Sequence, residues 1–335
     1  MKTATITEQE DINLDGVLDS MTIKPVKSSR KTKFTFIDLF AGIGGTRLGF
    51  ESAGGKCVFT SEWDTFSQKT YEANFGDKPH GDITKIHTSD IPDFDVLLAG
   101  FPCQPFSSIG RRQGFEHATQ GTLFYDVARI IKDKQPRAFM LENVPGLLTH
   151  DKGQTFEIIK KTLDEIGYTV GYKVLNSAEF GVPQQRKRIY IVGFRKELVA
   201  DDFDFEFPVG MKKDVYINQF LERDAVGYSI SKKLQDGYMR KLDDGRPMLV
   251  DHSTAVHVKT LVASYHKIQR LTGTFVSDGE TGMRLFTESE CKAIMGFPTD
   301  YKIPVSRTQM YRQFGNSIVV PVVSAVAKKM AKVLS

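Results

Sequence analysis

Short apolar runs alternate with amphipathic stretches along residues 34–194. The runs have the length of buried strands, and the stretches between them carry apolar residues at helical spacing. The predicted strands cover 34–40, 56–62, 94–100, 137–144 and 188–194, and the predicted helices cover 44–53, 64–75, 123–133 and 153–166. Strands that alternate with helices predict an α/β fold, with a mixed, mostly parallel sheet covered by helices on both faces.

This alternation stops after about residue 205. Residues 206–300 are rich in turn signals such as DDGRP and SDGETG, which favour a smaller, irregular and β-rich domain. The chain then closes with an apolar helix over 319–334, which resembles the first part of the chain more than the second. We therefore expect a tail over 1–32, an α/β domain made of 33–210 together with 301–335, and a second domain over 211–300.

Composition excludes several classes of protein. The chain has 335 residues, of which 40% are hydrophobic and 26% charged, as in ordinary soluble globular proteins. No apolar stretch reaches the length of about 18 residues that a membrane span needs, and the N-terminus lacks a signal-peptide core. Cys57, Cys103 and Cys291 are odd in number and far apart, so they predict neither a disulfide framework nor a zinc site. We expect a cytoplasmic protein without a metal.

Charge is distributed unevenly, although its total is only +4. Residues 1–20 carry five acids and one lysine, whereas 21–33 carry five bases and no acid, which predicts a loosely docked tail. Residues 232–274 hold eight Lys or Arg against four acids. The total permits an anionic partner without demanding one, and this local excess of bases indicates where such a partner would bind.

Three glycines follow the first predicted strand. Gly42, Gly44 and Gly45 stand in FIDLFAGIGG, between the strand and the helix. Glycines there let the backbone turn tightly and approach a ligand, although tight strand-to-helix packing alone gives the same pattern. Arg47 occupies the third-glycine position of the dinucleotide-binding motif, and the chain has no P-loop. A nicotinamide dehydrogenase and a phosphate-hydrolysing enzyme are therefore disfavoured.

Two acidic residues, one after the second predicted strand and one after the next predicted helix, strengthen the prediction of a ligand-binding site near the glycines. Glu62 ends the second predicted strand, where an acid accepts hydrogen bonds from ribose hydroxyls. Asp82, in GDIT, follows the next helix and could contact an adenine edge. Each acid alone is more often a surface residue or a helix cap. Together they predict a pocket for a ligand that contains adenosine and little phosphate.

Cys103 lies in the polar loop GFPCQPFSSIGRRQGF, beyond the strand 94–100. Pro102 and Pro105 restrict the backbone on either side of it. A cysteine in a globular protein is usually an inert small hydrophobe, but loops beyond strand ends are where active-site residues are found. The histidine motif of the cysteine proteases is missing, so a thiolate here would attack another kind of electrophile.

Polar residues also flank the last two predicted strands. Glu142 and Asn143 end the strand 137–144, where a carboxyl that faces a pocket can have a raised pKa and donate a proton. Arg186 and Arg188 are two residues apart near a strand start, so they would point to the same face. Such a pair could hold a carboxylate or a phosphate, or it could belong to a solvated, basic edge strand.

These motifs resemble those of bacterial DNA (cytosine-5) methyltransferases of the restriction–modification type. The resemblance runs in order over nearly all of residues 34–335. Its segments are FIDLFAGIGG, EWD, GDIT, GFPCQPFS, GTLF, LENV, PQQRKRIY, ECKAIMGFP and QFGNS. Any one segment could arise by chance, whereas the ordered set is specific, and PCQ, ENV, QxRxR and GNS are its most typical parts.

The resemblance implies roles for individual residues. Pro102 and Cys103 would form the nucleophile motif, and Glu142 would contact the N3 edge of the target cytosine. Arg186 and Arg188 would support the cytosine and the catalytic loop. The S-adenosylmethionine pocket would be lined by Phe40, Gly42, Gly44, Glu62, Trp63, Asp82, Pro102 and Leu123, and closed by Asn316 from the C-terminal helix.

The residue types suit the reaction of that family. Cytosine C5 is a poor nucleophile, and attack of the Cys103 thiolate on C6 would make the ring enamine-like, so that C5 could accept the methyl group. A proton or hydrogen bond from Glu142 at N3 would stabilise the developing charge. Positive charge from Arg188 and the sulfonium of the cofactor would favour the thiolate, and the reaction requires no metal.

The resemblance implies double-stranded DNA as the partner, with the target base flipped out of the helix. Residues 107–115 would close as a lid, with Ser107, Arg111 and Arg112 near the DNA. Loops of the 211–300 domain would read the sequence, and Thr260 and Leu261 match the family's Thr-Leu pair. Candidate phosphate and base contacts there are Lys232, Lys233, Arg240, Arg246, Lys259, Thr260 and Arg270.

Two other functions stay open. One eukaryotic branch of this superfamily acts on transfer RNA, although the recognition region here resembles that branch less well. An inactive paralogue would bind without methylating, but the intact Cys103, Glu142, Arg186 and Arg188 argue against it. We expect a monomer and, by family habit, a cognate restriction endonuclease that is linked in function and need not be bound.

Overall fold

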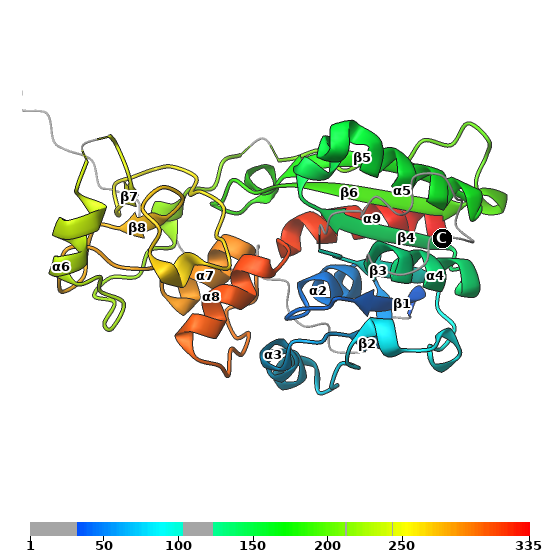
Figure 1. Cartoon of the computed structure of the whole chain (residues 1–335), viewed down its shortest axis with the longest axis horizontal. Helices are drawn as coiled ribbons and strands as arrows, with labels where there is room; N and C mark the ends of the chain where they lie inside the picture. Colours follow the sequence, from blue (N-terminus) through cyan, green and yellow to red (C-terminus); the bar gives the residue numbers. More distant parts are fainter. Residues whose placement is uncertain (1–31, 103–122, 212, 243) are drawn as a thin grey trace, which may run out of the picture.

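The computed structural model describes residues 32–102, 123–211, 213–242 and 244–335. Figure 1 shows a larger lobe built around a sheet, which carries both the first strand and the last helix, and a smaller lobe beside it. The predicted nucleophile and lid residues lie outside the described residues: Cys103, Ser107, Arg111 and Arg112.

Within the described residues, a six-stranded sheet forms the larger lobe, in the order β2-β1-β3-β4-β6-β5. Its strands are β1 (Phe34–Leu39), β2 (Gly55–Ser61), β3 (Val96–Ala99), β4 (Ala138–Asn143), β5 (Tyr168–Asn176) and β6 (Lys187–Arg195). β1 pairs in parallel with β2 and β3, and β3 pairs in parallel with β4. β6 is antiparallel to both β4 and β5. The predicted α/β class with a mixed, mostly parallel sheet is therefore confirmed.

The hydrophobic pattern does not predict β5, and its position explains why. β5 lies at the edge of the sheet, with β6 beside it, and its middle residues are exposed or half-buried. Tyr172 and Val174 are among its exposed side chains. An edge strand buries little, so β5 lacks the continuous apolar run that marks the inner strands of a parallel sheet.

Helices cover both faces of the sheet, as predicted. They are α2 (Gly45–Ser52), α3 (Thr65–Phe75), α4 (Leu123–Lys134), α5 (Gln154–Glu165) and α9 (Val320–Leu334). Successive side chains of a strand point to opposite faces. Phe36 therefore packs in the core shared with α2 and α9, whereas Ile37 packs in the core shared with α4 and α5.

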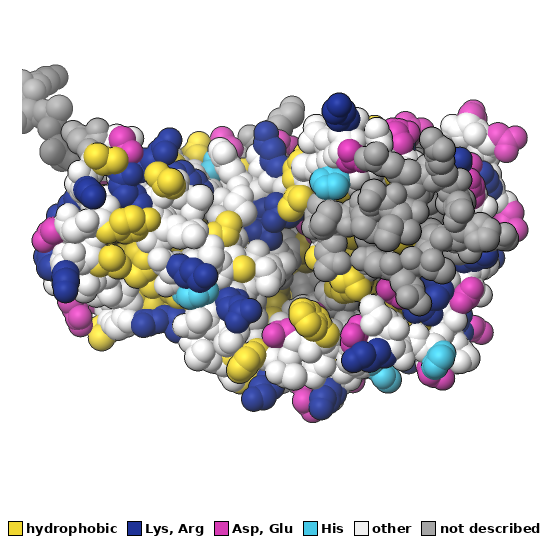
Figure 2. All heavy atoms as spheres, in the orientation of Figure 1, with side chains coloured by type: hydrophobic (Ala, Val, Ile, Leu, Met, Phe, Trp, Pro, Cys, Tyr) yellow, Lys and Arg dark blue, Asp and Glu magenta, His cyan; other side chains and the backbone are white. Residues whose placement is uncertain are grey.

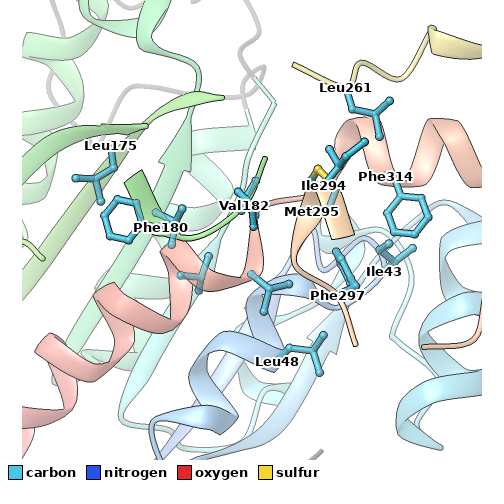
Figure 3. Close-up of a cluster of buried hydrophobic side chains, with 14 of the residues drawn as sticks. Ile43, Leu48, Leu175, Phe180, Val182, Leu261, Ile294, Met295, Phe297 and Phe314 are labelled. Atoms are coloured by element: carbon cyan, nitrogen blue, oxygen red, sulfur yellow. The ribbon is translucent and has the colours of Figure 1, made fainter. Parts of the chain in front are cut away.

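The last helix completes the first lobe. α9 runs against α2, and Gly49 of α2 lies so close to Val323 that an added Cβ would be 2.5 Å from a Val323 methyl group. Val326 and Met330 of α9 are fully buried in the same core. Figure 3 shows part of this core. Leu48 of α2 and Val182 point into one cluster with Phe297 there, and Val182 lies between β5 and β6 in the sequence. Segments from both ends of the sequence thus share one hydrophobic core.

The smaller lobe has little regular structure in its described residues. Its strands β7 (Met248–Val250) and β8 (Thr274–Val276) pair in parallel, and α6 (Lys232–Leu234) is short. Helices α7 (Glu288–Met295) and α8 (Arg307–Asn316) follow. We did not predict α7, although Thr287 and Glu290 form the capping box that marks a helix start in sequence.

Asn316 differs from its predicted position. We expected it on the C-terminal helix, which is wrong: it is the last residue of α8. α8 ends there because Ser317 is extended, with φ −73° and ψ 163°, and α9 begins only at Val320. Among the described helices, none is both long enough and apolar enough to cross a membrane.

Candidate active site

A cavity of about 710 Å³ opens where β1, β2, β3 and β4 end. Carboxyl ends of parallel strands are where α/β proteins bind their ligands. The cavity wall brings together most of the predicted site residues: Phe40, Gly42, Glu62, Trp63, Asp82, Pro102, Leu123, Glu142, Arg186, Arg188 and Asn316. α8 adds Gln309, Arg312 and Gln313, to which sequence analysis assigned no role, although Gln313 begins the QFGNS segment.

The glycine loop and Glu62 form one end of the cavity. Glu62 accepts hydrogen bonds from the Gly42 N–H at 2.8 Å and the Asp64 N–H at 2.7 Å, so its carboxylate is held in a fixed position. Burial raises the pKa of Glu62, and these backbone hydrogen bonds oppose that rise. Gly42 has φ +54° and open space where a Cβ would stand. A ligand can therefore approach the backbone here closely.

Trp63 and Asp82 stand beside this end of the cavity. The Trp63 side chain is 78% exposed, which is unusual for so large an apolar ring and leaves its face free for stacking. Asp82 accepts hydrogen bonds from the backbone N–H and the hydroxyl of Thr84, at 3.0 and 2.8 Å, and these bonds lower its pKa. An ionised acid and an exposed ring suit an adenosine group.

Gly44 is the one predicted cofactor residue that does not line the cavity. Its φ is +83°, and an added Cβ would overlap the ring of Phe75 and come within 3.2 Å of Tyr71. Both rings belong to α3. Gly44 therefore lets α3 pack against the start of α2, which is the structural alternative that the glycine pattern left open.

Glu142 and Arg188 face each other at the opposite end of the cavity. Arg188 Nε lies 3.0 Å from Glu142 Oε1, and both side chains are largely buried. Burial raises the pKa of Glu142, while the charges of Arg188 and Arg186 oppose the rise. The geometry therefore holds a carboxyl group that can carry a proton and fixes its orientation with a cation.

Asn143 joins the ends of β3 and β4 beside this pair. Its Nδ2 donates to the carbonyl of Phe101 at 3.0 Å, and its Oδ1 accepts from the Val144 N–H at 2.8 Å. Phe101 precedes Pro102, the last described residue before Cys103. Asn143 therefore fixes the backbone from which the predicted nucleophile loop leaves, a role that the ENV motif alone did not reveal.

Arg186 and Arg188 both line the cavity, but their guanidinium groups have different partners. Arg188 pairs with Glu142, whereas Arg186 is 4% exposed and donates to the carbonyls of Leu261, Gly315 and Ser317 at 2.8 to 3.0 Å. Burial lowers the pKa of Arg186 to about 10. The alternative of a solvated edge strand is wrong, because β6 lies between β4 and β5.

The predicted DNA contacts that the structure describes, Arg246 and Thr260, are not part of the cavity wall. Arg246 is exposed, in a loop where its N–H donates to Asp244 at 3.1 Å. Thr260 is half-buried, and its hydroxyl donates to the Gln185 carbonyl at 2.8 Å. Figure 2 shows Lys and Arg side chains gathered over the smaller lobe in this view.

Arg270 is not available as a DNA contact, contrary to expectation. Its side chain is 6% exposed, and it donates to the carbonyls of Met239 and Leu242 at 3.1 and 2.9 Å. Both Asp244 oxygens accept from the same guanidinium. Arg270 therefore holds the loop that carries Arg246 instead of presenting its own charge to a partner.

Comparison with known proteins shows the family. The family described as C-5 cytosine-specific DNA methylase matches residues 34–332. The type II methyltransferase M.BsuFI of Bacillus subtilis is 61% identical over 305 residues, covering 91% of this chain and 74% of that protein. M.MspI of Moraxella sp. is 55% identical over 322 residues, covering 96% of this chain and 76% of that protein.

Solved structures support the fold. DNMT2 of Spodoptera frugiperda matches with a TM-score of 0.71 at 22% identity, covering 90% of this chain and 99% of that one. Dnmt2 of S. pombe matches with a TM-score of 0.70 at 21% identity, covering 90% and 98%. The family match over most of the chain shows that this protein belongs to the C-5 cytosine-specific DNA methylases, enzymes that methylate C5 of cytosine in DNA.

Proposed function

We propose that the protein transfers a methyl group from S-adenosylmethionine to C5 of a specific cytosine in double-stranded DNA. The observation that carries this proposal is the pairing of Glu142 with Arg188 across the cavity from Glu62 and Trp63. One end suits a nucleoside, and the other offers a proton donor to a base. The relatives named type II methyltransferases support a role in a restriction–modification system.

The residues at the first end fit S-adenosylmethionine. Gly42 leaves room for a ligand at the backbone, Glu62 is placed to accept ribose hydroxyls, and Trp63 offers a ring to the adenine. Asp82 would contact the adenine edge, and Asn316 would close the cavity from the end of α8. When bound, this cofactor supplies a methyl group on a positively charged sulfur.

The residues at the second end would activate the cytosine. Pro102 lines the cavity, and Cys103, the next residue in the sequence, would add its thiolate to C6. Glu142 would donate its proton toward N3, because burial has raised its pKa, and Arg188 would hold the carboxyl in place. C5 would then accept the methyl group, after which loss of the C5 proton to a base, expulsion of the Cys103 thiolate and return of the N3 proton to Glu142 would restore the aromatic ring.

Catalysis and DNA recognition would belong to two different domains, and the catalytic domain would be made of two separate segments of the chain. Residues 33–210 and 301–335 would form the catalytic, cofactor-binding domain, and the packing of α9 on α2 supports this division. Residues 211–300 would form the target-recognition domain, with Arg246 and Thr260 at the DNA. Ser107, Arg111 and Arg112 would approach the flipped base or the phosphates as the lid of residues 107–115 closes.

A methyl-transfer assay tests this function directly. We expect the full chain to move tritium from labelled S-adenosylmethionine to duplex DNA and not to transfer RNA, since the relatives at 61% and 55% identity are named for type II systems. Cys103→Ser should bind DNA without transferring methyl groups. Methylation by that variant at the wild-type rate would overturn the covalent mechanism, and transfer to RNA alone would overturn the DNA substrate. Bisulfite sequencing of DNA from expressing cells would then locate the modified cytosine.

A further inference from the structure

The segment before β6 is hydrogen-bonded to residues 258–263, which we call the recognition segment because they lie in the proposed target-recognition domain. The Gln185 N–H donates to the Val258 carbonyl at 2.9 Å, and the Val258 N–H donates to the Pro183 carbonyl at 2.8 Å. The Thr260 hydroxyl adds a third bond to the Gln185 carbonyl at 2.8 Å. These bonds hold residues 258–261 along residues 183–186, next to the cavity.

Gln184 is part of the QxRxR motif, and the catalytic scheme gives it no role. Its side chain is completely buried, Oε1 accepts from the Leu261 N–H at 2.7 Å, and Nε2 donates to the Ile294 carbonyl at 3.1 Å. One amide therefore joins the recognition segment to the last turn of α7. In Figure 3 the side chains of Leu261, Ile294 and Phe314 gather in one cluster.

Arg186 extends the same connection to the cofactor end of the cavity. Nη1 donates to the Leu261 carbonyl at 2.9 Å, and Nη2 donates to the carbonyls of Gly315 and Ser317 at 3.0 and 2.8 Å. Those two carbonyls flank Asn316, which lines the cavity. Leu261 is thus held through its N–H by Gln184 and through its carbonyl by Arg186.

Close packing at Gly315 reinforces this connection independently. A Cβ at Gly315 would overlap the backbone of Val262 and Ala263, so the end of α8 and the recognition segment are in direct backbone contact. Neither segment can shift alone without breaking buried hydrogen bonds or causing a steric overlap.

We propose that Gln184 and Arg186 are positioning residues that couple DNA recognition at residues 258–263 to the closing of the cofactor cavity at Asn316. The inference rests on the proposed function, because it takes DNA and S-adenosylmethionine as the two ligands. When DNA binds and displaces Leu261, Arg186 transmits the displacement to the carbonyls on either side of Asn316. Coupling between two sites is reciprocal, so each ligand tightens the binding of the other by the same factor.

The coupling factor is the ratio of the cofactor Kd without DNA to the cofactor Kd with DNA. It is measurable with the protein's own fluorescence. Trp63 is the single tryptophan of the chain, and it lines the cavity. Its emission can report binding of S-adenosylhomocysteine, which lacks the methyl group, with and without a duplex carrying the site found by bisulfite sequencing. For the wild type we expect the duplex to lower the Kd for S-adenosylhomocysteine by about 5-fold or more, within the usual range of such couplings.

Two variants and a matched control test the assignment. Gln184→Met keeps the side-chain length and removes both hydrogen bonds, and Arg186→Lys keeps the charge without the fork that spans three carbonyls. We expect both to bring the coupling factor close to one. For Gln184→Met, whose side chain does not line the cavity, the Kd without DNA should change by less than about 3-fold. Tyr168→Phe removes another buried bond, from the Tyr168 hydroxyl to the Pro136 carbonyl, far along the chain from the recognition segment, and should keep the wild-type factor.

The outcomes separate coupling from a merely structural role. Gln184→Glu retains an acceptor for the Leu261 N–H and should recover part of the factor that Gln184→Met loses. A wild-type factor in both Gln184→Met and Arg186→Lys would overturn the inference, as would the same loss in Tyr168→Phe. A wild-type enzyme that methylates DNA without any coupling would overturn the inference alone, whereas a wild type that methylates no duplex would overturn the proposed function.

Discussion

Asp38 carries a buried carboxyl group near the end of β1, and neither of its oxygens has a hydrogen-bond partner among the described residues. Burial raises its pKa from 3.8 to about 8, although Arg47 opposes the rise. The folded state therefore holds a proton that the unfolded chain releases above pH 4. The free energy of unfolding should fall as the pH rises from about 4 to about 8, because the unfolded state binds fewer protons.

We expect Asp38→Asn to remove most of this pH dependence. The amide has nearly the same shape and no charge, so at pH 8 the variant should be more stable than the wild type by about 1 kcal/mol or more. Urea unfolding at pH 5.5 and pH 8 measures the effect. Parallel changes in the two proteins over that interval would show that Asp38 does not titrate in it.

Glu142 is another largely buried acid with a raised pKa, and its role predicts a different result. Glu142→Gln keeps a hydrogen-bond donor at the base but cannot transfer a proton. We expect the single-turnover rate of methylation to fall by about 100-fold or more, with little change in the Kd for S-adenosylhomocysteine. A raised pKa also predicts that the wild-type rate declines as the pH rises through it. Weaker cofactor binding at an unchanged rate would remove Glu142 from the proton-donor role.

The glycine loop links the helices to the cavity, and its glycines serve different purposes. Gly42 faces open space, whereas Gly44 is packed against Phe75 and Tyr71 of α3. Both have positive φ, so alanine costs about 1 to 2 kcal/mol at either position. At Gly44 the overlap with Phe75 adds about 1 to 3 kcal/mol.

This difference predicts opposite effects of two neighbouring substitutions. Gly44→Ala should lower the free energy of unfolding more than Gly42→Ala does. Gly42→Ala should weaken cofactor binding more, because its methyl group would stand in the cavity. Chemical unfolding and Trp63 fluorescence give the two rankings. The reverse order in either measurement would contradict the separation of packing from binding.

The helices and strands were predictable where burial is the same along the whole element. The inner strands are buried on both faces, so their apolar runs stand out in the sequence, and the helices that cover them carry clear periodicity. β5 escaped prediction because an edge strand needs no such run. α7 escaped because its eight residues lie in a turn-rich region, although its capping box was readable. Most of the catalytic and cofactor residues expected from the sequence do line the cavity.

The partners of Arg186 could not be predicted in the same way. The motif gives the residue, but the carbonyls that it binds belong to segments 75 to 131 residues away. Their approach depends on how α8 and the recognition segment pack, which no local pattern records. For the same reason, Arg270 looked like a DNA contact in sequence and is a buried support for its loop.

At the scale of the whole molecule, residues 232–274 of the smaller lobe hold eight Lys or Arg against four acids, and Lys and Arg side chains gather over this lobe in Figure 2. A phosphate contact made by Arg246 releases about one counterion, so Arg246→Gln should reduce the slope of log K against log salt by about 0.9 for duplex DNA. Its stability should stay close to the wild-type value, because Arg246 is exposed. Fluorescence anisotropy at several salt concentrations measures the slope.

Arg270→Gln is the matched control for that experiment. It removes one positive charge from the same lobe but leaves the Asp244 carboxylate and two carbonyls without their buried partner. We expect a lower free energy of unfolding, or local disorder of the loop, before any effect that can be attributed to a phosphate. If Arg270→Gln were stable and changed only the salt slope, the assignment of the two arginines would be reversed.

The packing of α9 on α2 also sets an order of events during synthesis. Roughly 290 residues separate β1 from α9, and ribosomes add about 5 to 20 residues per second, so the first strand and helix wait about 15 to 60 s for the helix that covers them. Through that interval the apolar side of α2 faces solvent or a chaperone. A chain truncated before Val320 would lack α9, so the apolar side of α2 would stay uncovered. The segment that carries the Ser317 carbonyl would also no longer be held by α9. Methylating activity should therefore emerge only from chains translated through α9.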